Sequence, residues 1–157
     1  MIVDEVLAEH ARVIAGNALT GRAKITPYYP GEKHLAAEAV FTGGSEGSVT
    51  FPYAMAGDRI QRNQFSALWV VRVTGTADVA KAMLRRSELV RVVLGTLDDG
   101  SELVGFTAEG EKLTDVNPDG QPIQITTREG DDPKTGRPIA VAEITVPYET
   151  QTLNTES

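Results

Sequence analysis

The stretch that decides the fold runs from Phe65 to Thr74 and reads FSALWVVRVT. Alternate residues in it are apolar, with the period of a β-strand: Phe65, Ala67, Trp69, Val71 and Val73. Leu68 and Val70 make the opposite face apolar as well. The pattern therefore predicts a central strand covered on both sides, or covered on one side by a partner subunit. We expect Trp69, the single tryptophan, to lie in the core.

An amphipathic helix is predicted at the start of the chain, from Ile2 to Leu19. Its apolar residues recur at spacings of three and four, which places them on one face: Val3, Val6, Leu7, His10, Val13, Ile14 and Ala18. The sequence offers His10 no cluster of metal-ligating neighbours. We therefore interpret His10 as a partly buried packing residue and not as a metal ligand.

A second helix is predicted after Gly75, with Asp78 or Thr76 as its N-cap. We expect its buried stripe to be Ala80, Met83, Leu84, Ser87, Val90, Val93, Leu94 and Leu97. The charged outer face is then Lys81, Arg85, Glu88 and Arg91. Residues Leu89 to Leu97 are also compatible with a strand. The pair Arg85-Arg86 is interpreted as a solvated helix face or an ion-pairing face at a subunit contact, in preference to a DNA-binding patch.

Short strands account for most of the remaining sequence. We expect them at Arg22–Thr26, Leu35–Thr42, Val49–Tyr53, Glu102–Ala108, Lys112–Val116, Pro122–Arg128 and Ile139–Tyr148. Turns are expected at Asp98–Gly100 and Asn117–Gly120, a loop at Gly57–Gln64, and polar hairpins at Gly43–Ser48 and Gly130–Gly136. The two polar hairpins bury little within one subunit, so we expect them to be interaction elements.

The order of these elements predicts an α+β fold, a mainly antiparallel sheet packed by two helices, with long polar hairpins. We expect one domain over residues 1–149 and a loose polar C-terminal tail over residues 150–157, beginning near Glu149. The predicted core is Val6, Leu7, Ile14, Trp69, Val71, Val73, Leu84, Val90, Leu94, Ile125, Ile144 and Val146.

Composition narrows the possible functions. The chain has 157 residues and a formal net charge of -7, which argues against a free-standing nucleic-acid binder. It has no cysteine, so disulfides, thiolate nucleophiles and cysteine-ligated metal sites are excluded. The N-terminus shows no signal-peptide pattern, and no apolar run approaches the roughly 20 residues of a membrane span. We expect a protein made in the cytosol without a targeting segment.

No motif in the sequence favours an enzyme. The acidic pairs Asp98/Asp99 and Asp131/Asp132 fall in predicted turns, and neither pair has the spacing of a calcium loop. The serines lack the context of an activated nucleophile. We assign no catalytic residue, metal ligand or cofactor. Two alternatives remain open: a metal-dependent hydrolase that uses Asp98, Asp99 and Glu102, and a monomeric peptide- or protein-binding module that docks a strand along Val49–Tyr53.

Four stretches together resemble a known family. They are the helix Ile2–Leu19, the loop Tyr28-Tyr29-Pro30, the segment Trp69–Thr74 leading into Ala77-Asp78, and the strand Glu143–Tyr148. In this order they are similar to the tail terminator (tail completion) proteins of long-tailed bacteriophages. The resemblance covers most of the chain as a pattern of elements and rests on no diagnostic residue.

The resemblance implies a structural virion protein of the tail or neck, assembled in the host cytoplasm. Such proteins form a homo-oligomeric ring, usually a hexamer, on the last ring of the tail tube. They end tube growth and present a surface to the head connector. DNA passes through the channel without specific binding, which suits an acidic chain. Another neck or tail-tube structural role is the neighbouring possibility.

Charge patterning suggests which residues meet in such a ring. Like charges repel across symmetric contacts unless a neighbour supplies the opposite charge. We therefore expect the subunit interface to involve Arg85, Arg91, Asp131, Asp132 and Lys134, with turn acids facing helix bases of the adjacent subunit. The remaining turn acids, Asp98 and Asp99 among them, would line the channel. Plain solvent exposure of these charges is the alternative.

Overall fold

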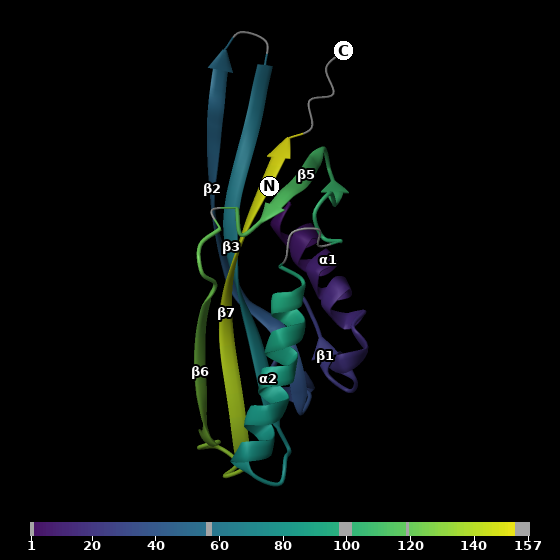
Figure 1. The fold of residues 1–157 in the computed structure, drawn as a ribbon, viewed down its shortest axis with the longest axis vertical. Coiled ribbons are helices and arrows are strands. Elements are labelled where there is room, and N and C mark those ends of the chain that lie inside the picture. Colours follow the sequence, from purple (N-terminus) through teal and green to yellow (C-terminus); the bar gives the residue numbers. More distant parts are fainter. Residues whose placement is uncertain (1, 56–57, 98–101, 119, 153–157) are drawn as a thin grey trace.

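The computed structural model describes residues 2–55, 58–97, 102–118 and 120–152 and shows an α+β fold (Figure 1). Its helical elements are α1 (Val3–Ala15), α2 (Val79–Gly95) and the short 3-10 turns η1 (Ala18–Thr20) and η2 (Glu32–His34). Its strands are β1 (Lys24–Ile25), β2 (Glu38–Met55), β3 (Asp58–Thr74), β4 (Thr107–Ala108), β5 (Glu111–Val116), β6 (Gln124–Asp131) and β7 (Pro138–Thr152). The predicted fold class is confirmed. No helix in the described ranges is long and apolar enough to cross a membrane.

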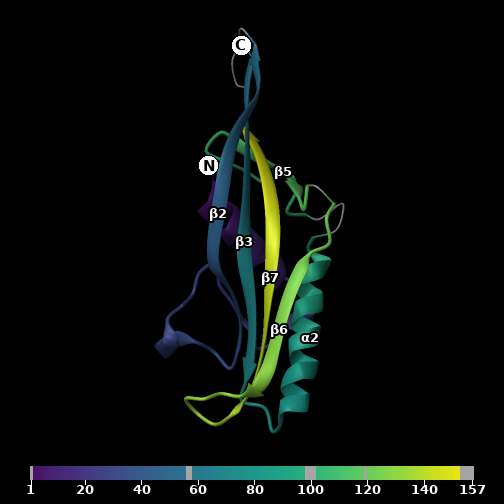
Figure 2. The ribbon, with the colours of Figure 1, turned by 90° about the vertical axis from the view of Figure 1, so that its left-hand side faces the viewer.

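The strands form one sheet of seven, in the order β1-β2-β3-β7-β5-β4, with β6 also paired to β7. The first half of β7 pairs with β6, and its last residues pair with β5. All pairs are antiparallel except β1 with β2. Both helices pack on the same side of the sheet (Figures 1 and 2). We call this side the helix face and the other side the open face.

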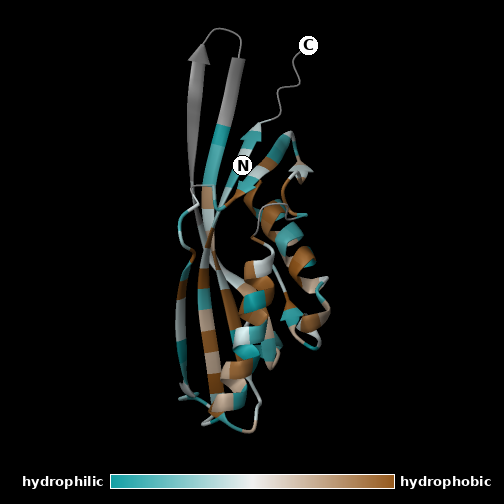
Figure 3. Ribbon diagram, viewed as in Figure 1, coloured by the Kyte–Doolittle hydropathy of each residue, from teal (hydrophilic) through white to brown (hydrophobic). Residues whose placement is uncertain are grey.

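The central strand predicted at Phe65–Thr74 is confirmed within β3. Alternate residues of β3 lie in the core on the helix face: Phe65, Ala67, Trp69, Val71 and Val73. Leu68 and Val70 point to the open face and are half-buried. Figure 3 shows apolar segments along the middle of β3 and β7 and on α1, whereas the far ends of β5 and β7 are hydrophilic. Hydrophobic burial between helices and sheet therefore holds the body together.

The first helix buries the face that its periodicity predicts, including Val6, Leu7, His10 and Ile14. The second helix begins after Asp78, whose side chain accepts a hydrogen bond from the backbone N–H of Lys81 at 2.8 Å. Its helical structure continues to Gly95, so the alternative of a strand at Leu89–Leu97 is wrong.

The buried face of α2 differs from the prediction. The residues of α2 that pack into the core are Ala82, Arg86, Leu89, Val92 and Val93. Leu84 is 68% exposed, and Val90 and Leu94 are only half-buried. Helix α2 carries two apolar stripes, and the stripe with the small Ala82 packs on β3 and β7. Ile125 is also outside the core, at 39% exposed, because it lies on the edge strand β6. The other eight predicted core residues are buried.

Strand β2 is longer than expected. Gly43–Ser48 is not a hairpin tip, because the strand continues through it to Met55 with irregular register after Thr42 and again after Thr50. The first irregularity contains Gly43 and Gly44, which are typical of a β-bulge. The loop expected at Gly57–Gln64 is strand from Asp58 onward. The hairpin extends beyond the sheet, since β3 pairs with β7 only from Arg62 (Figure 1). We call residues 51–55 and 58–61 the arm.

In the C-terminal half, the strands begin and end at other residues than predicted. The strand expected at Glu102–Ala108 shrinks to β4, which joins β5 through a tight turn with positive φ at Glu109 and Gly110. Strand β7 continues to Thr152, because Thr150 is fully buried and pairs with β5. The residues expected in the tail from Glu149 to Thr152 are therefore part of the sheet. Asp98, Asp99, Asp119 and residues 153–157 lie outside the described ranges.

Candidate functional site

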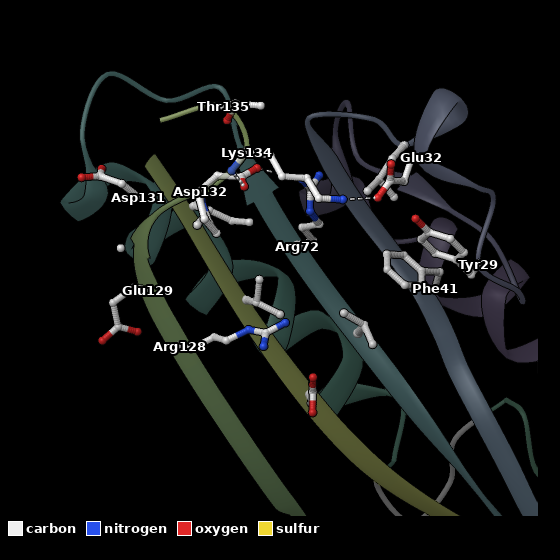
Figure 4. Close-up of a pocket in the computed structure, with 17 residues that line it drawn as sticks. Tyr29, Glu32, Phe41, Arg72, Arg128, Glu129, Asp131, Asp132, Lys134 and Thr135 are labelled. Carbon is white, nitrogen blue, oxygen red and sulfur yellow. Dashed lines mark hydrogen bonds and ion pairs between the residues drawn. The ribbon is translucent and has the colours of Figure 1, made fainter. Parts of the chain in front are cut away.

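A groove of about 710 Å³ lies on the open face of the sheet (Figure 4). Its floor is apolar and comes from three strands: Phe41 of β2, Val70 of β3, and Ile139 and Val141 of β7. Strand register explains why these side chains share a face. Phe41 pairs directly with Val70, and Val141 pairs with Arg72, which lies two residues after Val70 and so on the same face of β3. The floor is thus assembled from segments that are distant in sequence.

Two loops form the walls of the groove. One wall is the segment before β2, where the Tyr29 ring contacts the Phe41 ring at a centroid distance of 5.3 Å. The other wall is the hairpin between β6 and β7. Lys134 donates a hydrogen bond to Glu32 at 2.7 Å and so joins the two walls across the groove (Figure 4). This hydrogen-bonded pairing raises the pKa of Lys134 and lowers the pKa of Glu32.

Asp132 organises the hairpin wall. Its backbone N–H donates to the carbonyl of Arg137, and its own carbonyl accepts from Gly136, each at 2.7 Å. Its carboxylate accepts a hydrogen bond from the backbone N–H of Lys134 at 2.9 Å and lies 3.8 Å from the guanidinium of Arg72. The polar loop between β6 and β7 is therefore confirmed, although it is shorter than expected because β6 includes Gly130 and Asp131.

Three of the five predicted interface residues meet at this groove. Asp131, Asp132 and Lys134 all line it. Asp132 and Lys134 are already paired within the subunit, whereas the Asp131 side chain is exposed and has no partner in the described ranges. Asp131 is therefore the acid of this hairpin that remains available to a neighbour.

Arg85 and Arg91 lie on α2, on the other side of the sheet. Arg85 donates to Glu38 at 2.9 Å, to Glu88 at 2.7 Å and to the carbonyls of Leu19 and Thr20. The expectation that Arg85 lies on the outer face of the helix is wrong, because these contacts draw it into the subunit, where its side chain is 18% exposed. Arg91 is exposed, and no described residue pairs with it.

Arg86 is a buried cation that the sequence interpretation missed. It donates to Glu129 at 2.6 Å and to the carbonyl of Arg128 at 3.0 Å, so it joins α2 to β6. The expectation of a solvated or intersubunit Arg86 is wrong. One signal was present in the sequence: Arg86 follows Ala82 by four residues and precedes Leu89 by three, and both are core residues.

A buried polar chain runs through the core between the two helices and the sheet. Trp69 donates its indole N–H to the Tyr148 hydroxyl at 2.7 Å, and Thr96 donates its hydroxyl to the Val93 carbonyl at 2.6 Å. Because the Thr96 proton is used, Thr96 accepts from His10 Nε2 at 2.7 Å. Nδ1 of a neutral His10 must then accept from the Tyr148 hydroxyl at 2.6 Å.

This arrangement needs His10 in its neutral form. Burial lowers the pKa of His10 from 6.5 to about 3 and raises the pKa of Tyr148. The prediction that His10 is a packing residue is confirmed, and its burial is complete and not partial. The polar chain ties the core together: His10, Trp69 and Tyr148 are fully buried, and the half-buried Thr96 ends it at the C-terminus of α2.

Within the described ranges, no three His, Asp or Glu side chains converge as metal ligands. Of the acidic cluster considered for a hydrolase, Asp98 and Asp99 lie outside those ranges, and Glu102 is 4.0 Å from Arg12. The described residues form surfaces suited to contact: a groove, an arm and open strand edges. No protein-family model matches the sequence, and no curated protein has significant similarity to it.

Proposed function

We propose that this chain is the subunit of a ring-forming structural protein, specifically a tail terminator of a long-tailed bacteriophage. In this role it ends growth of the tail tube and joins the tail to the head connector. It would be located in the tail or neck of the virion after assembly in the host cytoplasm. The specific family rests on the resemblance of the sequence, whereas self-assembly is supported by the sheet.

The observation that carries the proposal is the pair of open edges of the sheet. On one side, β1 covers β2 only at Ala39 and Val40, so that described residues of β2 beyond Val40 pair with β3 alone. On the other side, β6 pairs with β7 alone. Open edges present unpaired backbone N–H and C=O groups, which monomeric proteins usually cover. Two different edges on one subunit suit a head-to-tail contact, and such contacts form a ring when the rotation between subunits closes and an open filament when it does not.

The arm supports the same function. Its strands pair with each other from Tyr53–Ile60 to Met55–Asp58 and with no third strand in the described ranges. An isolated two-stranded hairpin is marginally stable in water. We therefore expect the arm to gain a partner in the assembly, either a neighbouring subunit, the tail tube protein or the head-tail connector protein. The net charge of -7 per chain is suited to a channel through which DNA passes without binding.

Light scattering after size-exclusion chromatography tests self-assembly, and negative-stain imaging tests the ring. We expect one discrete oligomer, a hexamer, with a central channel. A second sample, in which the chain is mixed with polymerising tail tube protein, should show tubes capped at one end. A chain that is monomeric alone and leaves tube length unchanged would overturn the proposal.

A monomeric binding module is the second candidate. The open β2 edge also favours this function, because residues Val49–Tyr53 lie on it and offer a strand-addition site for a partner peptide. The mass of the particle in solution distinguishes the two candidates. A binding module remains monomeric until its partner is added, whereas a ring subunit associates with itself.

A further inference from the structure

The second apolar stripe of α2 is only partly covered within the subunit, where Met83, Val90 and Leu94 pack against the margin of the core. Leu84 is 68% exposed, and Met83, Val90 and Leu94 are half-buried. These residues belong to the stripe that the sequence pattern marks as the apolar face of the helix. A helix that is apolar on two sides is expected to bury both of them. The subunit alone buries only the stripe that packs on the sheet.

A groove of about 280 Å³ separates this stripe from the edge strand β6. It is lined by Arg86, Ser87, Val90, Arg91, Leu94 and Thr127. Ile125 extends the apolar surface along the same face of β6, because it pairs with the core residue Ile144. The exposed Arg91 lies at the groove, and no described residue neutralises it. Val90 and Leu94 therefore give the groove its apolar part, beside the polar Ser87 and Thr127 and the exposed Arg91.

Strand β6 adds backbone to this surface. All of its residues except Gly130 are exposed, and it pairs only with β7 in the described ranges. An approaching strand would gain main-chain hydrogen bonds from β6 and apolar contacts from α2. The surface thus fits an extended segment better than a helix.

The chain itself supplies such a strand. Strand direction alternates across β6, β7, β3 and β2, because each of these neighbours is antiparallel. A second copy placed alongside in the same orientation therefore brings its β2 antiparallel to β6 of the first. A ring requires this head-to-tail contact, in which different edges of the two copies meet.

The register favours the open part of β2. Thr127 pairs with Ala142, Ala142 pairs with Val71, and Val71 pairs with Val40. Thr127 and Val40 therefore lie on the same line across the four strands. The eight-stranded TIM barrel, with a shear of 8, staggers by about one residue per strand, and we take this value as the guide. Four strands then shift the contact by about four residues, to the region of Ser45. This region lies just beyond the part of β2 that β1 covers. A shift of four residues in the opposite direction would place Thr127 beside residue 36 of the second copy, which precedes the start of β2 at Glu38.

We propose that the flank of α2 and the edge of β6 are the docking surface for the open edge of β2 from a second copy of this chain. This inference rests on the proposed ring and names the edges that join its subunits. A twofold contact between two β6 edges is the competing arrangement. It would leave β2 open, would close a dimer and would place two unneutralised Arg91 side chains along one seam.

Cysteine crosslinking tests the contact directly, because the chain contains no cysteine of its own. Thr127 and Ser45 are exposed, and both lie on the helix face, since Ser45 pairs with Ala67 and Thr127 pairs with Ala142. We expect the double variant Thr127→Cys/Ser45→Cys to give a ladder of covalent multimers on mild oxidation. Each single variant should remain uncrosslinked. Thr127→Cys with Gly47→Cys tests a register two residues away on the same face.

Each other outcome contradicts the inference. A covalent dimer from Thr127→Cys alone would show the twofold β6 contact. A ring seen by light scattering but not crosslinked by either double variant would overturn this contact while leaving the proposed function intact. A chain that is monomeric at all concentrations and also leaves tube length unchanged would overturn both.

A point substitution provides an independent measurement. Leu84→Glu should raise the subunit dissociation constant at least about tenfold, because it places a charge in the apolar contact. Leu84 is mostly exposed in the subunit, so its folding should be unchanged by circular dichroism. Val104→Glu is the matched control, since Val104 is 40% exposed, lies in the segment before β4 and does not line this groove. Equal dissociation constants for the two variants would contradict the docking surface.

Discussion

The Tyr148 hydroxyl donates to Nδ1 of His10 at 2.6 Å and so connects the last strand of the sheet to the first helix. The two residues are 138 positions apart in sequence. The contact continues through Thr96 at the end of α2, so both helices are tied to β7 by one neutral histidine. Protonation of this side chain in acid should therefore loosen the contact of both helices with β7.

Acid should destabilise the folded state through His10. Its pKa is lowered from 6.5 to about 3, so between these values the unfolded chain binds a proton that the folded chain does not. Stability therefore falls as pH decreases through this window, by up to about 1.4 kcal/mol per pH unit from this group. Urea unfolding at a series of pH values measures the slope. His10→Asn should flatten it, and the exposed His34→Gln should not; a slope unchanged in His10→Asn would contradict the assignment.

The orientation of α2 should appear in two alanine substitutions on the same helix. Leu89 is 1% exposed, so Leu89→Ala should cost about 2–5 kcal/mol through lost burial and a cavity. Leu94 is half-buried, so Leu94→Ala should cost less than half of that in a monomeric subunit. Chemical denaturation of both variants gives the comparison. Equal losses would mean that the helix is rotated from the orientation described.

The two arginines Arg85 and Arg91 should separate folding from assembly. Arg85→Ala should lower the free energy of unfolding by about 1–3 kcal/mol, because it leaves Glu38 and two backbone carbonyls without their donor. Arg91→Ala should change it by less than about 0.5 kcal/mol, because Arg91 is exposed and unpaired in the described structure. Its effect should appear in assembly, measured by light scattering. A destabilised Arg91→Ala subunit would be inconsistent with this division.

Charge at the groove hairpin should affect ring formation. Asp131 is exposed, and no described residue pairs with it, so Asp131→Lys should leave the subunit fold intact. If Asp131 faces a basic residue of a neighbour, the reversal should weaken assembly, and more strongly at low salt, where screening is least. Light scattering over a salt series measures this. Asp4→Lys, another exposed reversal far from the groove, is the control. The same salt dependence in both variants would leave only the effect of net charge.

Some features followed from local sequence. The alternation at Phe65–Thr74 identified β3 and its core face, and the spacing of Val6, Leu7 and Ile14 identified the buried face of α1. Asp78 was correctly expected as an N-cap, because this preference depends only on the neighbouring backbone N–H groups. Asp131, Asp132 and Lys134 line one groove, whereas the subunit contact expected of them stays a prediction.

Other features required contacts between distant segments. Gly43 and Gly44 look like a turn in isolation, yet pairing with β3 holds them in a long strand. Arg85 and Arg86 are adjacent and chemically identical. Arg85 is drawn to η1 and Glu38, and Arg86 is drawn to β6, because each guanidinium finds acceptors that only the fold brings near.

The sequence by itself determined the elements whose causes are local: the period of each helix and strand, the helix cap, and the absence of cysteine chemistry. Only the tertiary structure decided which of the two apolar stripes of α2 is buried, because both have helical spacing and the sheet can accept one of them. It also decided where the groove lies, since Phe41, Val70 and Val141 become neighbours through strand register alone. Side-chain period is encoded residue by residue, whereas the pairing of faces and edges depends on the free energy of the whole sheet.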